Sequence, residues 1–249
     1  LLVPATTENS QISSPDGAPV VGVLMTSLVA TLKKSTDSFK YSLYLGYDEG
    51  DHVYDNAEAR GRLLQRLGGM IDKHPVGVVL SRFPVSRSTT FVWNGLFDRA
   101  LDEGADYLFC AHDDTEFYPT SSKFWASVMV NSLKSNPLRA NFGVAGPLDM
   151  RSPKMISHPF VHKTHRDVFG SLFPLALSNV EHDEWMSRVY GYKSTFLHSA
   201  AQVYNTHRYT GRARSCPQSK QLVDREIAAS AEILKQWVFR QVGVAGWTF

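Results

Sequence analysis

The sequence predicts a single α/β domain built on a mostly parallel sheet that is flanked by helices. Through the first half of the chain, short apolar runs alternate with segments of helical periodicity, which is the pattern of βαβ units. The first of these runs is apolar on both faces, as expected of a strand that is covered on both sides. With 249 residues, 43% of them hydrophobic and 20% charged, the chain can form one substantial core.

The elements of the first half follow in order. Residues 1–18, rich in Ser, Thr, Pro, Asn and Gly, are expected to be a flexible lead-in, so that the folded domain covers residues 19–249. Apolar runs predict strands over residues 20–28, 39–46, 76–81 and 106–111. Apolar side chains at helical spacing predict two helices, over residues 56–72 with Asn56 as the cap and over residues 88–103 with Gly104 at the end.

The second half of the chain is more mixed. The pattern predicts a helix over residues 121–135, a strand over 142–146, a loop-rich stretch rich in His and Arg, and a long final helix after a basic loop. No change of composition marks a second domain. We therefore expect a sheet-forming part, about residues 20–150, followed by a variable part, about residues 151–249, that completes a site.

Composition and charge exclude several classes of protein. The formal net charge of +2, from 26 basic and 24 acidic residues, gives no general attraction for nucleic acid. No stretch approaches the roughly 18 apolar residues that span a bilayer, so no membrane span is expected in this chain. Cys110 and Cys216 are the only cysteines, which excludes a disulfide framework, and Cys110 lies in an apolar run and is expected in the core.

The most informative feature is an apolar run, residues 107–111, that ends in the adjacent carboxylates Asp113 and Asp114. Ligands of open α/β sheets bind outside the carboxyl ends of the strands, where this pair is expected. Hard cations such as Mg²⁺ and Mn²⁺ take oxygen ligands, and sites that also hold substrate phosphates use one or two carboxylates. The alternative is a solvated turn in which the same residues act as a helix cap.

Around this pair, residues 84–115 resemble the nucleotide-binding half of GT-A glycosyltransferases. In that family a loop with an Arg enters a helix with an Asn, and a strand then ends in the metal-binding DXD motif. Here these features are Arg87, Asn94 and His-Asp-Asp-Thr at residues 112–115, followed by an aromatic residue and a proline. The resemblance implies a GT-A, Rossmann-like fold, with Asp114 as a metal ligand and Asp113 facing either the ribose or the metal shell.

The resemblance also implies further contacts to the nucleotide. Asp48, Glu49 and Asp51, which follow the second apolar run of the chain, are similar to the acidic position that binds uracil or ribose, although solvation of a loop explains two of the three. Arg87 would contact a phosphate or the base, or else is a surface arginine. Asn94 would orient the nucleotide or lie on the polar face of its helix.

The acceptor side is represented by residues 173–185, which resemble the family motif of an acid pair beside an aromatic residue at the start of a helix. In inverting members one such carboxylate is the general base that deprotonates the acceptor hydroxyl. Asp183 and Glu184 are the candidates, and Glu184 aligns better with the second acid of the family motif. Partial burial beside Trp185 would raise the pKa of either acid toward the working range. The alternative is a helix whose first turn carries acids that favour its dipole.

A late histidine and a basic loop complete the resemblance. His207 is the candidate for a further metal ligand, and Arg212 is the candidate for closing over the diphosphate, since arginine matches phosphate geometry and keeps its charge. The loop could instead be an exposed basic face. The competing His198 lies in an apolar segment, which indicates a core or edge residue, and the histidines of residues 158–165 lack the spacing of a zinc site.

Together these features predict a metal-dependent glycosyltransferase that uses Mn²⁺ or Mg²⁺ and a nucleoside-diphosphate sugar, with UDP-sugars favoured and GDP-sugars possible. The sugar would pass to a hydroxyl of a glycan or glycoprotein acceptor, with inversion favoured over retention. A sugar nucleotidyltransferase, a non-catalytic sugar-nucleotide-binding module and a metal-dependent phosphoesterase remain as alternatives. The family's frequent location favours the lumen of the secretory pathway over the cytoplasm.

Overall fold

The computed structural model describes residues 1–8, 10–32, 39–85, 88–118, 124–177, 181–206 and 220–243. In chain order the strands are β1 (Leu2–Pro4), β2 (Tyr41–Asp48), β3 (Val76–Phe83), β4 (Tyr107–Phe109), β5 (Thr115–Phe117), β6 (Val144–Asp149), β7 (Phe160–His162) and β8 (Thr195–Asn205). The α-helices are α1 (Thr26–Leu32), α2 (Ala57–Ile71), α3 (Thr89–Asp102), α4 (Trp125–Lys134), α5 (Thr164–Phe169), α6 (His182–Val189) and α7 (Lys220–Val242). The fold is therefore α/β, as the sequence predicts. The predicted mostly parallel sheet is not what the structure shows, because the strands form a parallel sheet of three and a mixed sheet of five.

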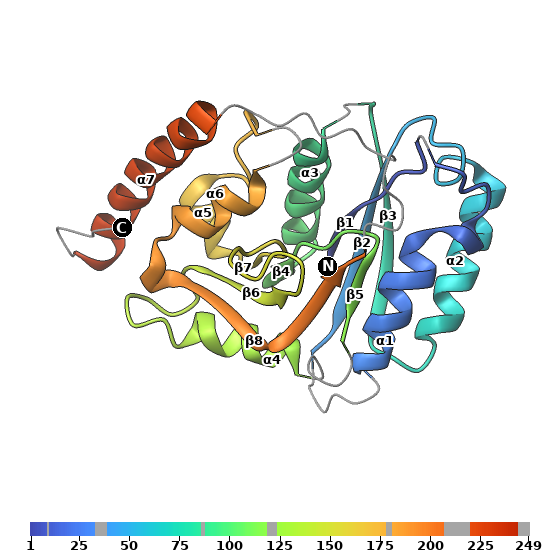
Figure 1. Cartoon of the computed structure of the whole chain (residues 1–249), viewed down its shortest axis with the longest axis horizontal. Coiled ribbons are helices and arrows are strands. Elements are labelled where there is room, and N and C mark those ends of the chain that lie inside the picture. Colours follow the sequence, from blue (N-terminus) through green and yellow to red (C-terminus); the bar gives the residue numbers. More distant parts are fainter. Residues whose placement is uncertain are drawn as a thin grey trace.

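The first sheet is parallel and has the order β1-β2-β3. Successive side chains of β2 point to opposite faces of this sheet. Leu43 and Leu45 pack in one core cluster with residues of α1 and α2, whereas Tyr44 packs in the other with residues of α3. Figure 1 accordingly shows α1 and α2 on one side of the parallel strands and α3 on the other. Helices thus cover both faces, which is the usual arrangement around a parallel sheet.

The second sheet is mixed, with the order β4-β7-β6-β8-β5. The strand β7 runs antiparallel to both β4 and β6, so β4 and β6 run in the same direction. The two sheets meet where Leu2 and Cys110 form an isolated parallel bridge and the Ala111 N–H donates to the Leu2 carbonyl at 3.1 Å. Strand β4 is therefore aligned with β1, and the carboxyl ends of β1, β2, β4 and β6 lie toward one edge.

The helices of the second half cover the mixed sheet and the end of the molecule away from α1 and α2 (Figure 1). Helix α4 packs on β6 and β8, while α7 packs on α5 and α6. The ring of Trp237 on α7 stacks on Phe142, with centroids 5.5 Å apart, and so joins this helix to the start of β6. No helix in the part of the chain that the structure describes is long and apolar enough to cross a bilayer.

Two predictions at the N-terminus are wrong. Residues 20–28 do not form a strand but lie in a π-helical turn, Val20–Met25, that continues into α1. The flexible lead-in predicted for residues 1–18 instead contains the strand β1, in which Leu2 and Val3 are fully buried. A continuous apolar run suits a buried helix as well as a buried strand, and a strand of three residues is too short to show a period.

The helices α2 and α3 begin and end close to the predicted residues, whereas α5 lies in a stretch that the sequence predicts to be rich in loops. The Asn56 side chain accepts a hydrogen bond from the Ala59 N–H at 2.9 Å and caps α2. Ser88 caps α3 in the same way, and Gly104 follows that helix with a φ of 91°, a conformation that favours glycine. These caps satisfy backbone groups that each helix leaves unpaired at its start, so local sequence fixes the position of both helices.

Candidate functional site

Three acids lie at the same edge of the joined sheets because they follow parallel strands. Asp48 ends β2, Asp113 follows β4, and Asp149 ends β6. Phe109 and Ala145 both pair with Phe160 of β7, so Asp113 and Asp149, each four residues further along, lie at about the same level. One strand separates the members of each neighbouring pair. At the usual spacing between strands, about 10 Å lies between the ends of β2 and β4 and again between those of β4 and β6.

Asp113 and Asp114 are both buried, with exposed fractions of 4% and 5%. They occupy a tight turn between β4 and β5, which is closed by the Thr115 N–H donating to the His112 carbonyl at 3.1 Å. The Thr206 N–H at the end of β8 donates to the Asp114 carbonyl at 3.3 Å. Carboxylates are the oxygen ligands that a hard divalent cation takes, and sites that also bind substrate phosphates use one or two of them.

The acid Asp183 approaches this edge from the first turn of α6. Its pKa is raised from 3.8 to about 7, first by burial and then by the negative charge of Asp149. Burial raises the pKa of Cys110, at the end of β4, and the charge of Asp183 adds to that effect. Asp183 therefore lies near both β4 and β6, and its pKa suits a general base at neutral pH.

The segment that leads to α6 is held against α3 by buried hydrogen bonds. The Asn94 amide group donates to the Phe173 carbonyl and accepts from the Phe173 N–H, both at 2.9 Å. Thr90, one turn earlier on α3, is hydrogen-bonded to the Leu177 carbonyl and to Nε2 of His182. Asn94 is thus engaged by the protein backbone, and it positions the acceptor-side segment.

Trp93 connects the same segment with the acidic turn. Its ring meets that of His112 edge-on, with centroids 5.3 Å apart, and that of His182 at 5.2 Å. His112 immediately precedes Asp113, and His182 immediately precedes Asp183. One buried aromatic ring therefore packs against the neighbours of both acids, which fixes their relative placement.

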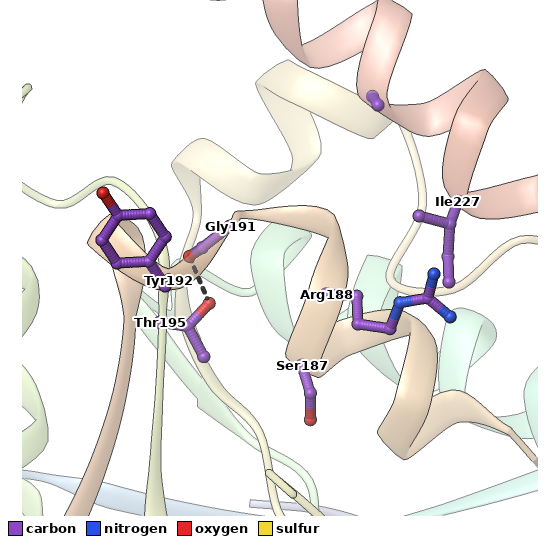
Figure 2. Close-up of a pocket in the computed structure, with 7 residues that line it drawn as sticks. Ser187, Arg188, Gly191, Tyr192, Thr195 and Ile227 are labelled. Atoms are coloured by element: carbon purple, nitrogen blue, oxygen red, sulfur yellow. Dashed lines mark hydrogen bonds between the residues drawn. The ribbon is translucent and has the colours of Figure 1, made fainter. Parts of the chain in front are cut away.

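Glu184 has a different environment from Asp183. Its carboxylate accepts from Nη1 of Arg188 at 2.6 Å, and the same nitrogen donates to Asp224 of α7 at 3.0 Å. Figure 2 shows Arg188 extending from α6 toward Ile227 of α7. Both residues line a hollow of about 550 Å³. Glu184 is therefore part of a half-exposed ion-pair cluster that joins two helices. The hollow lies at the carboxyl end of α6, whereas Asp183 lies at its start.

Of the three acids that follow β2, two have clear structural roles. Asp51 accepts from both the N–H and the hydroxyl of Thr7 at 2.6 Å, and it ties the N-terminal segment to the loop. Glu49 pairs with Arg82 at 2.9 Å on the surface. Asp48 is half-buried at the strand end that faces the acidic edge. The position of Asp48 is thus the one best suited to contact a ligand there.

Two of the described histidines in the second half, His165 and His198, have their own protein partners. His165 lies 2.8 Å from the Tyr190 hydroxyl and 3.0 Å from the Leu172 carbonyl, and burial lowers its pKa to about 4. His198 lies 2.7 Å from the Ser132 hydroxyl at the edge of the mixed sheet. These two residues are neutral packing residues, in keeping with the predicted core or edge role of His198.

Several predicted site residues lie outside the described part of the chain, namely Arg87, His207 and Arg212. Among the described residues, no three His, Cys, Asp or Glu side chains are grouped so that they could hold a metal ion. Thr206, which precedes His207 in sequence, is the residue hydrogen-bonded to Asp114.

Two residues of this region, Asp149 and His158, were missed by the sequence analysis. Asp149 is 2% exposed, and His158 is fully buried between it and the acidic turn. Asp149 ends an apolar run just as Asp113 does, and this signal could have found it. His158 has no local signal, because its role depends on the pairing of β7 with β4 and β6.

No protein-family model matches the chain, and no curated protein matches it in sequence. The functional assignment therefore depends on the geometry of the site.

Proposed function

We propose that this protein is a metal-dependent glycosyltransferase of the GT-A class, which transfers a sugar from a nucleoside diphosphate to a hydroxyl group of a glycan or glycoprotein. The observation that carries the proposal is the placement of Asp183. This acid has a pKa of about 7 and lies near the strand ends that present Asp113 and Asp149. An adjacent carboxylate pair and a separate acid poised near neutral pH are the two groups that such a transfer requires.

The donor would lie along the edge of the sheet. A nucleoside diphosphate is an extended ligand, and the separation of about 10 Å between the ends of β2 and β4 suits one that reaches from Asp48 to Asp113. Asp48 would accept hydrogen bonds from the ribose or the base. A divalent cation held by Asp114 and Asp113, with His207 as a further ligand, would neutralise the charge that develops on the departing diphosphate. Arg87 and Arg212 would add positive charge to the same group.

The acceptor hydroxyl would be deprotonated by Asp183 and not by Glu184. A general base must reach the substrate and must exchange a proton near the working pH. Asp183 faces the acidic edge and has a raised pKa, whereas Glu184 is held by Arg188 on the other side of the helix. A carboxylate placed to activate the acceptor supports an inverting reaction, in which the acceptor oxygen attacks the carbon opposite the diphosphate.

The α/β architecture also supports the proposal. The parallel strands and the mixed strands are continuous through the Leu2–Cys110 bridge, and helices cover both faces of the parallel part. A non-catalytic binding module could use the same donor edge. Such a module would gain nothing from Asp183, whose partial burial near Asp149 lowers the stability of the folded protein at neutral pH.

The proposal is tested with purified protein, Mn²⁺ and a panel of UDP- and GDP-sugars. We expect UDP with Mn²⁺, but neither component alone, to raise the unfolding temperature, since a ligand that binds the native state stabilises it. We also expect slow Mn²⁺-dependent release of nucleotide from one donor, and faster release when a glycan acceptor is added. If no nucleotide binds in the presence of Mn²⁺ or Mg²⁺, the proposal is wrong.

A further inference from the structure

A chain of buried hydrogen bonds leads from the acidic turn to Asp149. The His112 N–H donates to Oγ1 of Thr115 at 2.9 Å, across the turn that contains Asp113 and Asp114. Oγ1 of Thr115 lies 2.9 Å from Nε2 of His158. Thr115 and His158 are both fully buried, so these contacts form away from solvent.

The chain continues on the other side of the imidazole ring. Nδ1 of His158 lies 3.3 Å from Oγ of Ser157, and the Ser157 hydroxyl donates to Oδ2 of Asp149 at 2.7 Å. Asp149 also accepts from the Arg151 N–H at 2.9 Å through its other oxygen, which fixes the orientation of its carboxylate. Four side chains thus join the end of β4 to the end of β6.

One arrangement of protons satisfies every contact in this chain. Oγ1 of Thr115 accepts from a backbone N–H, so its own proton is available for Nε2 of His158. The Ser157 proton is given to Asp149, so Oγ of Ser157 can accept from a proton on Nδ1 of His158. The imidazole is then neutral, with its single proton on Nδ1. Burial lowers the pKa of His158 to about 3, in keeping with this neutral form.

We propose that Thr115, His158, Ser157 and Asp149 are positioning residues, which we call the relay. Together they hold the acidic turn in the geometry that would bind the metal, and they fix its position relative to Asp183. The pKa of Asp183 is raised by burial and by the charge of Asp149. This inference deepens the proposed function and depends on it. The turn is short, and its shape is set by two bonds between residues 112 and 115, one of which uses the Thr115 hydroxyl. His158 contacts that hydroxyl from the side away from the turn. The relay would therefore orient Asp113 and Asp114 without itself contacting the metal or the nucleotide.

Removal of the Thr115 hydroxyl would take away the acceptor of the His112 N–H and the group that contacts Nε2 of His158. The carboxylates of the turn would then lose their fixed orientation. Residues that orient metal ligands in this way change metal affinity by about 10- to 100-fold when they are altered. Valine has nearly the shape of threonine, so Thr115→Val tests the hydrogen bond with little change in packing. Thr115→Ser keeps the hydroxyl and serves as the matched control.

The experiment measures binding of Mn²⁺ in the presence of UDP, by calorimetry and by the electron paramagnetic resonance signal of free Mn²⁺. We expect Thr115→Val to weaken binding by about tenfold or more, and Thr115→Ser to bind within about twofold of the parent. Ser157→Ala, between His158 and Asp149 in the relay, should also weaken binding. Combined with Thr115→Val it should add little, because residues of one network are not additive. Thermal unfolding without ligand shows whether each variant is folded.

The outcomes separate this inference from the proposed function. If the parent does not bind Mn²⁺ with UDP, the proposed function fails and the relay has no site to position. If the parent binds but folded Thr115→Val and Ser157→Ala bind equally well, the positioning role is wrong and the proposed function stands. Independent, additive losses in the double variant would also overturn the relay. Should Thr115→Val not fold, Ser157→Ala alone decides between these results.

Discussion

Replacement of Asp183 by asparagine should strongly slow the proposed transfer and stabilise the protein, whereas Glu184→Gln should do neither. The amide has the shape of the carboxyl group but cannot accept a proton, so we expect kcat to fall by about 10²- to 10⁴-fold, the usual contribution of a general base. Binding of the donor should be unchanged. Glu184→Gln removes a half-exposed ion pair with Arg188, which costs about 0–1 kcal/mol of stability and leaves the rate within about twofold.

The gain in stability follows from the raised pKa of Asp183. The folded protein keeps this proton up to about pH 7, whereas the unfolded chain releases it near the ordinary value of 3.8. The free energy of unfolding of the parent therefore decreases as the pH rises from about 4 to about 7. Three pKa units correspond to about 4 kcal/mol as an upper limit. Because part of the Asp183 surface remains in solvent, which screens the charge, we expect a gain of about 1–2 kcal/mol for Asp183→Asn at pH 8.

The assay combines nucleotide release in the presence of acceptor with urea unfolding at pH 4 and pH 8. For the parent, the transfer rate should rise with pH through about 7, since only the ionised form of Asp183 acts as a base. The stability gain of Asp183→Asn should be present at pH 8 and absent at pH 4. Normal turnover by this variant, or loss of turnover by Glu184→Gln, would refute the assignment of the base.

Three further changes test the rest of the site. Asp114→Ala should remove the Mn²⁺-dependent stabilisation by UDP while the ligand-free protein unfolds cooperatively, and equal stabilisation of variant and parent would reject Asp114 as a ligand. Asn94→Leu should cost about 2–5 kcal/mol in urea unfolding, because both backbone groups of Phe173 lose buried partners; a cost below about 1 kcal/mol would contradict this role. Asp51→Ala should cost about 2–4 kcal/mol and expose the segment around Thr7 to proteases, whereas unchanged protease resistance would show that other contacts hold this segment.

Local sequence signals predicted the helices better than the strands. The caps at Asn56 and Ser88 are local, and they fixed the starts of α2 and α3 within a residue of the prediction. Residues 20–28 lack such a signal, and their apolar character suits a buried helix as well as a strand. The strand β1 has three residues, and only its pairing with β2 and with Cys110 makes it a strand. Tertiary contacts therefore determine whether such segments form a helix or a strand.

The same distinction applies to the site. The acidic pair and Asp183 could be identified because each stands at a point where a strand ends or a helix begins. Their relation to Asp149 could not be predicted, because it depends on the register of β7 against two neighbours. The choice between Asp183 and Glu184 also depends on packing. Adjacent residues of a helix point about 100° apart, so one faces the sheet edge and the other faces Arg188.

The helix α3 explains how the two halves of the site come together. From the sequence, Asn94 is expected either to orient the nucleotide or to lie on the polar face of its helix, but its amide is hydrogen-bonded to the backbone that leads toward α6. Trp93, its neighbour on α3, packs against the residues that precede Asp113 and Asp183. A change in the packing of α3 would therefore shift the acidic turn, which holds Asp113 and Asp114, relative to Asp183, the proposed base. In the proposed transfer, α3 would thus help to set the catalytic geometry without contacting a substrate, because attack on the sugar would require the metal-binding turn and the base in a fixed relative position.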